Sequence, residues 1–152
     1  MRYRIIAIGQ LKRGFYQEGC DFYQKRLGNY AKFEVLERKE AHHSDANKVQ
    51  TLEGEALLSL VQGYTIALDE RGKRFKSREL ADRVSQLEQQ GISQISLLIG
   101  GAEGHGPALK ERCDDLWSLS DLTLAHELAR LMLLEQLYRI ESIRAGHPYH
   151  RD

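Results

Sequence analysis

A short apolar strand that runs directly into a glycine-rich loop is the feature that most limits what this chain can fold into. Residues 95–99 read Ile-Ser-Leu-Leu-Ile, and residues 100–107 read Gly-Gly-Ala-Glu-Gly-His-Gly-Pro. Glycine lets bare backbone N–H groups approach a ligand and permits positive φ angles. Pro107 suits the first turn of a helix. A strand, a glycine loop and a helix start in this order are typical of a cofactor pocket at the carboxyl edge of a parallel sheet.

Strand-like and helix-like segments alternate along the 152 residues. Apolar runs predict strands over Tyr3–Ile8, Phe33–Leu36, Tyr64–Leu68 and Ile95–Ile99. Apolar spacings of three and four predict helices over Phe15–Leu27, Ala46–Val61, from a Ser77 cap to a stop at Gly91, and over His126–Ile143. This alternation predicts one α/β domain spanning residues 1–152, with a mostly parallel sheet flanked by helices.

Charge and cysteine content narrow the class of protein. Lys and Arg balance Asp and Glu at 22 each, which argues against a freestanding nonspecific nucleic-acid binder but leaves room for a local basic patch. Cys20 and Cys113 are too few for a disulfide framework. No run approaches 18 apolar residues. We therefore expect a cytoplasmic protein that does not act on or in a membrane.

The predicted last helix is apolar on more than one face. Leu128, Met132, Leu133, Leu137 and Ile140 spread around most of its circumference. Such a helix needs more than one packing partner. One face can lie on the sheet and the other can meet a second copy of the chain, which favours a homodimer. A central helix of a monomer explains the same pattern.

The glycine loop matches neither of the common nucleotide motifs. No Gly-Lys-Ser/Thr follows it, and it has no third glycine at the dinucleotide spacing. It predicts a pocket for another ligand, or only a tight turn. The segment Leu116–His126 mixes apolar and small hydroxyl residues, so it can wrap such a ligand with backbone amides. Alternatively it is a plain connection in which Asp121 or Thr123 caps the last helix.

Two polar segments are candidate RNA contacts. The basic run Arg71–Arg78 surrounds Phe75, which suits RNA phosphates, although a solvated surface has the same composition. The tail Gly146–Asp152 carries an aromatic residue and a cation, a pair that suits stacking on a base. Its two histidines have no cysteine pair nearby to complete a structural metal site, so no metal is expected.

Five short motifs in the chain together resemble one known family. They are Leu98-Ile99-Gly100-Gly101-x-Glu103-Gly104, Trp117-Ser118-Leu119-Ser120, Leu122-Thr123-Leu124-x-His126, Glu135-Gln136-Leu137-Tyr138-Arg139 and His147-Pro148-Tyr149-His150-Arg151. In this order and over this length, the chain resembles the ribosomal RNA large subunit methyltransferase H family, small enzymes of the SPOUT class. The C-terminal third carries the specific motifs.

The resemblance implies a fold and an activity. Members of the family are homodimers with a SPOUT-type sheet and a trefoil knot in the C-terminal part, which no periodicity in this sequence predicts because knots are rare. They transfer a methyl group from S-adenosylmethionine to N3 of a pseudouridine in 23S rRNA, on the assembled ribosome.

The resemblance also implies the site residues. Leu68, Gly100, Gly101, Leu119, Ser120, Asp121, Leu122, Thr123 and Leu124 match the positions that hold the cofactor, and Tyr149, His150 and Arg151 match the catalytic tail. The acidic side chain of Asp121 is expected to face solvent. By residue type His150 is the first candidate base for the N3 proton and Tyr149 the second. Arg151 can offset negative charge that develops on the base carbonyls.

Two other functions fit parts of the same sequence. One is a SPOUT enzyme that acts on transfer RNA, against which the tail His147–Arg151 argues. The other is a nucleotide-binding regulator without enzymatic activity, on the same α/β scaffold. A methylation assay on tRNA separates the first alternative, and nucleotide binding without methyl transfer would identify the second.

Overall fold

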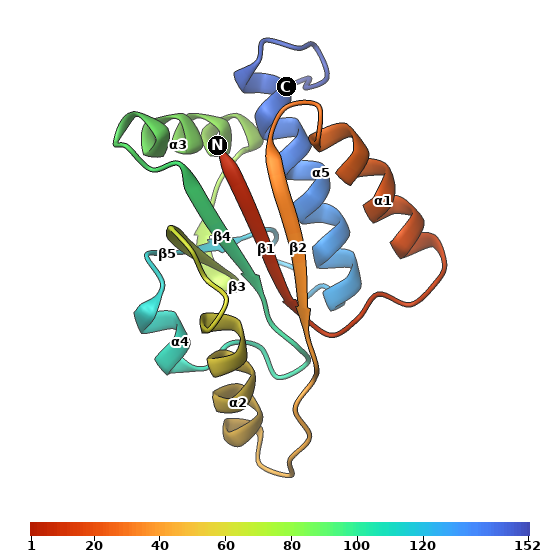
Figure 1. Cartoon of the computed structure of the whole chain (residues 1–152), viewed down its shortest axis with the longest axis vertical. Coiled ribbons are helices and arrows are strands. Elements are labelled where there is room, and N and C mark those ends of the chain that lie inside the picture. The colour runs from red at the N-terminus through yellow and green to blue at the C-terminus, as the bar shows by residue number, and fades with distance from the viewer.

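Five parallel strands form one sheet, in the order β2-β1-β4-β3-β5, in the computed structural model, which describes residues 1–152 (Figure 1). The strands are β1 (Arg2–Ile8), β2 (Lys32–Arg38), β3 (Tyr64–Arg74), β4 (Gln94–Ile99) and β5 (Asp115–Ser118). The helices are α1 (Phe15–Leu27), α2 (Ala46–Leu58), α3 (Ser77–Gln89), α4 (Pro107–Arg112) and α5 (His126–Arg144). All strand pairs are parallel, so the predicted α/β architecture is confirmed.

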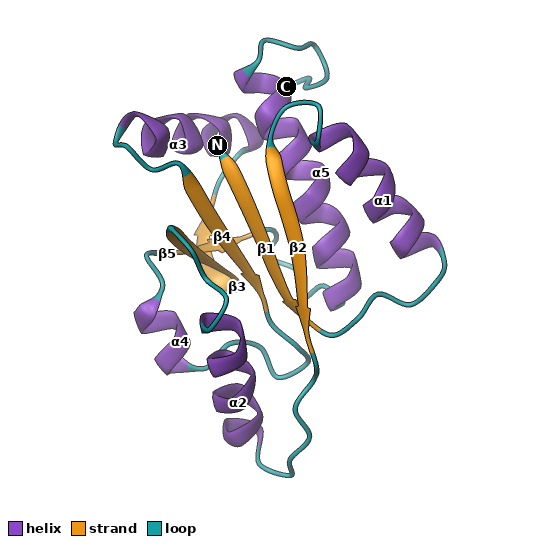
Figure 2. Ribbon diagram, viewed as in Figure 1, coloured by secondary structure: helices purple, strands orange, loops and turns teal.

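Helices cover both faces of the sheet, because side chains alternate along its buried strands. On β1, Tyr3, Ile5 and Ala7 pack in a core that includes α1, α3 and α5. Ile6 and Ile8 lie on the other face, in a smaller core with α2 and α4. Figure 2 shows α1 running beside α5, and α2 beside α4, as their contacts require. The loops that follow β1 and β4 gather at the edge to which the strand arrows point.

The predicted helix over Phe15–Leu27 matches α1 at both ends, and most other elements agree within two residues. One exception is α2, which ends at Leu58 rather than Val61. The N–H groups of Leu60 and Val61 bond to carbonyls only three residues back, so the last turn is tighter than an α-helix.

The pairing of β3 with β5 is the part of the sheet that the sequence pattern did not predict. β3 continues beyond Leu68 to Arg74, and its register with β5 breaks between Leu68 and Lys73. A Cβ at Gly72 would lie 2.7 Å from the Leu116 backbone, so only glycine allows this close approach. Residues 69–72 leave the sheet as a bulge at its carboxyl edge.

The start of α3 differs from the predicted serine cap. Lys76 occupies the cap position, and its N–H donates to the Glu79 carboxylate, 2.6 Å away. Ser77 is already helical, and its hydroxyl donates to Gln136 on α5 at 2.7 Å. The predicted cap at Ser77 is therefore wrong, since that hydroxyl ties α3 to α5 instead.

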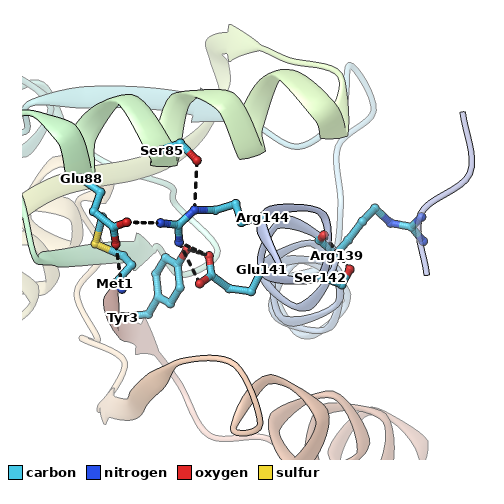
Figure 3. A network of polar contacts seen from close by, with 8 residues as sticks. All are labelled: Met1, Tyr3, Ser85, Glu88, Arg139, Glu141, Ser142 and Arg144. Atoms are coloured by element: carbon cyan, nitrogen blue, oxygen red, sulfur yellow. Dashed lines mark hydrogen bonds and ion pairs between the residues drawn. The ribbon is translucent and has the colours of Figure 1, made fainter. Parts of the chain in front are cut away.

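A polar network fixes the carboxyl end of α5 (Figure 3). Arg144 pairs with Glu88 of α3 at 2.7 Å and with Glu141 at 2.6 Å. The Tyr3 hydroxyl, on β1, donates to Glu141 at 2.9 Å. Burial, and then the nearby Glu141 carboxylate, raise the pKa of Tyr3, so its hydroxyl remains a donor. The C-terminal tail thus begins from a point that is held to both the sheet and α3.

Candidate functional site

A cleft of about 560 Å³ opens at the carboxyl edge of the sheet. Its walls come from the irregular stretch within β3, from the loop after β4 and from the segment between β5 and α5. Residues 68–71, 99–105, 119–120 and 122–126 line it, together with Gln50, Lys110 and Ala129. The size suits a small organic ligand. The predicted pocket beside the glycine loop is present at the expected edge.

The loop glycines serve two different physical needs. Only Gly104 has a positive φ, +69°. Gly101 is required for space: a Cβ there would lie 2.9 Å from Glu53 Oε1 and 3.1 Å from Ile8 Cγ2. The loop therefore lies directly on α2 and β1, which leaves its other side open to the cleft.

His105, in the glycine loop, contacts the end of β4 and so ties the loop to the strand that precedes it. Its Nε2 lies 3.2 Å from the Leu98 carbonyl oxygen, and a Cβ at Gly100 would be 3.2 Å from its ring. Burial lowers the pKa of His105, so the imidazole is neutral at pH 7 and Nε2–H donates to the carbonyl. This buried histidine rigidifies the loop that faces the ligand.

An ion pair closes the polar end of the cleft. Asp69, directly after Leu68, accepts from the Lys110 ammonium of α4 at 2.9 Å. Burial opposes ionisation of this carboxyl, but the Arg71 N–H and the Lys110 ammonium outweigh it and hold the pKa of Asp69 below its ordinary value. The cleft thus offers a fixed cation and anion beside the bare backbone.

Small hydroxyl residues shape the wall formed by 119–124. The Leu122 N–H donates to the Ser120 hydroxyl at 2.9 Å, and the Thr123 hydroxyl donates to Glu70 at 3.0 Å. The second bond joins this wall to the bulge within β3. The alternative prediction, that Thr123 or Asp121 caps α5, is wrong. Ala125 is the N-cap residue, and no side chain caps the helix.

Asp121 is the one predicted cofactor residue outside the cleft lining. Its side chain is exposed and pairs with Arg74 of β3. Leu68, Gly100, Gly101, Leu119, Ser120, Leu122, Thr123 and Leu124 all line the cleft. The acidic group therefore faces solvent, as expected, and its ion pair holds the wall from outside.

The tail residues lie away from the cleft of their own chain. The Tyr149 hydroxyl donates to Glu135 at 3.0 Å, and His150 Nδ1 lies 3.2 Å from Arg139. Arg139 is ten residues beyond Ala129, which lines the cleft. At 1.5 Å per helical residue the separation is about 15 Å along α5. One chain does not bring the two predicted halves of the site together.

One stripe of α5 runs from the cleft to the tail. Leu128, Met132, Glu135 and Arg139 follow the spacing of a single helix face. Leu128 and Met132 are half-exposed and belong to neither core. Leu122 is 71% exposed at the end of this stripe nearer the cleft. The apolar end of this stripe, Leu128 and Met132, has no partner within the chain, whereas Glu135 and Arg139 hold the tail.

Several cleft residues were not among the predicted site residues. They include Gln50, Asp69, Glu70, His105, Lys110 and Ala129. Asp69 directly follows the predicted strand end at Leu68, and Lys110 lies in the helix that starts directly after the glycine loop, so their positions alone could have marked them. Gln50 lies on α2, remote in sequence from the loops, and no spacing predicts that it lines the cleft.

Two further kinds of feature are absent from the chain. No helix combines the length and apolar content needed to span a bilayer. No three His, Cys, Asp or Glu side chains are grouped as ligands for one metal ion.

Known proteins resemble the chain over its whole length. A family model described as a predicted SPOUT methyltransferase matches residues 1–150. Two relatives named ribosomal RNA large subunit methyltransferase H, from Gloeobacter violaceus and Thermus thermophilus, are 41% and 40% identical, and each match covers 99% of both chains. The chain belongs to this SPOUT methyltransferase family.

Solved structures share the fold of this chain at low sequence identity. A probable methylase family protein from Haemophilus influenzae Rd KW20 matches with a TM-score of 0.56 at 11% identity, over 99% of this chain and 70% of that one. A putative methyltransferase from Legionella pneumophila, solved with the cofactor SAM bound, matches with a TM-score of 0.50 at 12% identity, over 90% of this chain and 65% of that one.

The Asp69–Lys110 pair predicts a pH-dependent loss of stability. Lys110→Met should cost about 1 to 2 kcal/mol at neutral pH, because it leaves a largely buried carboxylate without its cation. The folded-state pKa of Asp69 is depressed. The contribution is therefore present above the unfolded pKa of about 3.9 and is lost as pH falls through the lower folded value. Urea unfolding of wild type and variant from neutral to acid pH measures the difference.

Arg112→Met, on the exposed end of the same helix, is the matched control and should change stability little at any pH. If the Lys110→Met difference keeps its full size in acid, the pair does not stabilise the fold in the way described.

Proposed function

We propose that this chain is an S-adenosylmethionine-dependent methyltransferase that methylates N3 of a pseudouridine in 23S rRNA, on the assembled ribosome in the cytoplasm. The observation that carries the proposal is its full-length similarity, at about 40% identity, to relatives named ribosomal RNA large subunit methyltransferase H. The cleft at the carboxyl edge supplies the geometry that such an activity needs.

The cleft residues suit S-adenosylmethionine. Leu68, Gly100, Gly101 and the wall 119–124 supply bare backbone N–H groups and apolar surface, which fit an adenine ring. Asp69 and Lys110 supply one charge of each sign, which fits an amino-acid group. The cofactor brings an electrophilic methyl group on a sulfonium. The chain's task is then to align that methyl group with the incoming base.

A homodimer would complete the site. The stripe Leu128–Met132–Glu135–Arg139 leads from the cleft to the tail, and its apolar end is unpartnered. If two copies pack this stripe about a two-fold axis, the α5 helices run in opposite directions. Each tail then lies near the cleft of the other subunit. Phe15, 71% exposed on the neighbouring α1, can extend the interface.

The tail is proposed to act on the reacting base. The N3 atom of a uracil ring carries a proton at neutral pH, so this proton must leave before or during methyl transfer. Tyr149 packs partly buried against the larger core, and His150 and Arg151 follow it as polar side chains near the surface. They can orient the base, and a cation among them can stabilise the negative charge that develops on its carbonyls.

We further propose a trefoil knot in the C-terminal part. After β5 the chain crosses the carboxyl edge through residues 119–125 and enters α5, on the opposite face of the sheet from α4. β3 holds the crossing segment through Thr123–Glu70, at its bulge, and through Asp121–Arg74, at its last residue. A crossing held in this way is consistent with a threaded chain.

Gly101→Val should abolish binding of S-adenosylmethionine. The new side chain would meet Glu53 and Ile8 on one side, so the loop must move into the cleft. Isothermal titration calorimetry should detect no binding to a variant whose circular dichroism is unchanged. Ala108→Val places the same side chain at an exposed position on α4 and should bind normally. Unchanged affinity in folded Gly101→Val protein would rule out this cleft as the cofactor site.

Deleting Tyr149–Asp152 should lower methyl transfer by about 10²-fold or more, the scale of losing positioned polar groups at the reacting atoms. Fold, dimer and cofactor affinity should change little, because Tyr149 is the only deleted residue that packs against a core, and it is only partly buried. The assay uses ribosomes from cells that lack the gene. Mass mapping of 23S rRNA then shows whether one methyl group appears on a pseudouridine.

Free transfer RNA and wild-type protein are the controls. Wild-type protein that methylates tRNA but not ribosomes would contradict the proposed substrate. A tail-deleted protein with the full rate would show that the tail has no part in the reaction, and the catalytic groups would then have to be sought at His126 or Glu135.

A further inference from the structure

The C-terminal tail is held in one conformation by contacts to α1, α3 and α5. The Tyr149 ring packs on Tyr138 with centroids 4.5 Å apart, and Arg139 lies over its face at 4.7 Å. Asp152 pairs with Arg78 of α3 at 3.0 Å. In Figure 3, Arg139 projects from α5 on the side away from the Arg144 network. The tail is therefore a docked segment whose side chains have defined partners.

The contacts of His150 determine where its ring proton lies. A guanidinium only donates hydrogen bonds. Since Arg139 Nη1 lies 3.2 Å from His150 Nδ1, that nitrogen is the acceptor. The ring proton is then on Nε2, which donates to Asp152 at 2.9 Å. Both ring nitrogens are engaged, so the docked imidazole has no free lone pair with which to accept a proton from a substrate.

Tyr149 is no better placed to accept a proton. Its hydroxyl donates to the Glu135 carboxylate at 3.0 Å. Burial, then a side-chain hydrogen bond with Tyr23 of α1, and then the Glu135 carboxylate raise the pKa of Tyr149, so the hydroxyl stays protonated. Glu135 is also held by Arg139 at 2.5 Å. The charged groups that face the two tail residues are thus Glu135 and Arg139 from α5, with Asp152 and Arg78 beyond His150.

Arg151 differs from its neighbours. It is exposed, and it makes no hydrogen bond, ion pair or aromatic contact within the chain. Arg151 directly follows Tyr149 and His150, which Glu135 and Arg139 hold in place. The docked tail therefore presents one unpaired cation to whatever lies opposite it.

Resting on the proposed function, we propose that Glu135 and Arg139 are positioning residues for methyl transfer, and that Arg151 is the catalytic residue of the tail, while His150 positions the tail and takes no proton. Arg151 contacts the carbonyl oxygens of the reacting ring and stabilises its anion. The N3–H bond breaks with its proton passing to water. The N3–CH₃ bond then forms as the S–CH₃ bond breaks, and sulfur keeps the electron pair.

The role of His150 is tested with His150→Asn. The Asn amide oxygen can accept from Arg139 where Nδ1 does, but it cannot take up a proton at neutral pH. We expect methyl transfer to ribosomes within about tenfold of wild type, with the same rise of kcat/KM with pH. Arg151→Gln should lose about 10²-fold or more in kcat. A loss of that size in His150→Asn, with a changed pH profile, would make His150 the base and overturn the proposal.

The positioning role is tested with Arg139→Met. ¹⁵N NMR of labelled histidine reports directly which ring nitrogen carries the proton. Wild type should show His150 protonated on Nε2, and Arg139→Met should lose this fixed tautomer. Its kcat should fall by about 10²-fold, with cofactor affinity unchanged, and Arg139→Lys should recover part of that loss. Arg112→Met, remote from the tail, is the matched control for loss of one positive charge and should behave as wild type.

The outcomes separate this inference from the proposed function. A wild-type protein that does not methylate ribosomes refutes the function, whatever the NMR shows. If wild type is active and Arg139→Met keeps full activity, or if wild-type His150 carries its proton on Nδ1, the positioning role is refuted while the function stands.

Discussion

The close contact of the Gly101 backbone with Ile8 and Glu53 is the constraint on which the rest of the site depends. A Cβ there would lie 2.9 Å from a Glu53 carboxylate oxygen and 3.1 Å from Ile8 Cγ2, so a larger residue would have to displace the loop or its two neighbours. With the loop seated on β1 and α2, its free side faces the segment between β5 and α5. His105 fixes the same loop from within, through the Leu98 carbonyl. The cleft is the space left between these rigidly placed backbones.

Most of the sheet could be predicted from the sequence, including the edge strand β2, but the other edge strand, β5, could not. Apolar runs located β1 and β4, and helical spacing located α1, because burial on both faces leaves a strong pattern. β5 has four residues at the sheet edge and carries no such pattern. The serine at 77 looked like a cap, but its hydroxyl found a partner on α5. Local spacing cannot anticipate a partner 59 residues away.

Part of the candidate site could likewise be predicted from the sequence, and part of it could not. The glycine loop and residues 119–124 were predicted and line one cleft, with Asp121 outside it. The Asp69–Lys110 pair was not predicted, because it joins a strand end to a helix on the other side of β4. The separation of the tail from its own cleft also has no signal in the sequence. It follows from the way the tail folds back on α5, where Glu135 and Arg139 hold it.

The central claim is that each working site combines the cleft of one subunit with the tail of the other, and mixed dimers test it most directly. One subunit carries Gly101→Val and the other lacks Tyr149–Asp152, and each variant alone forms an inactive homodimer. In the mixed dimer one intact cleft faces one intact tail, so the account predicts methyl transfer to ribosomes at about half the wild-type rate per dimer. Mixed dimers as inactive as their parents would show that cleft and tail must come from the same chain.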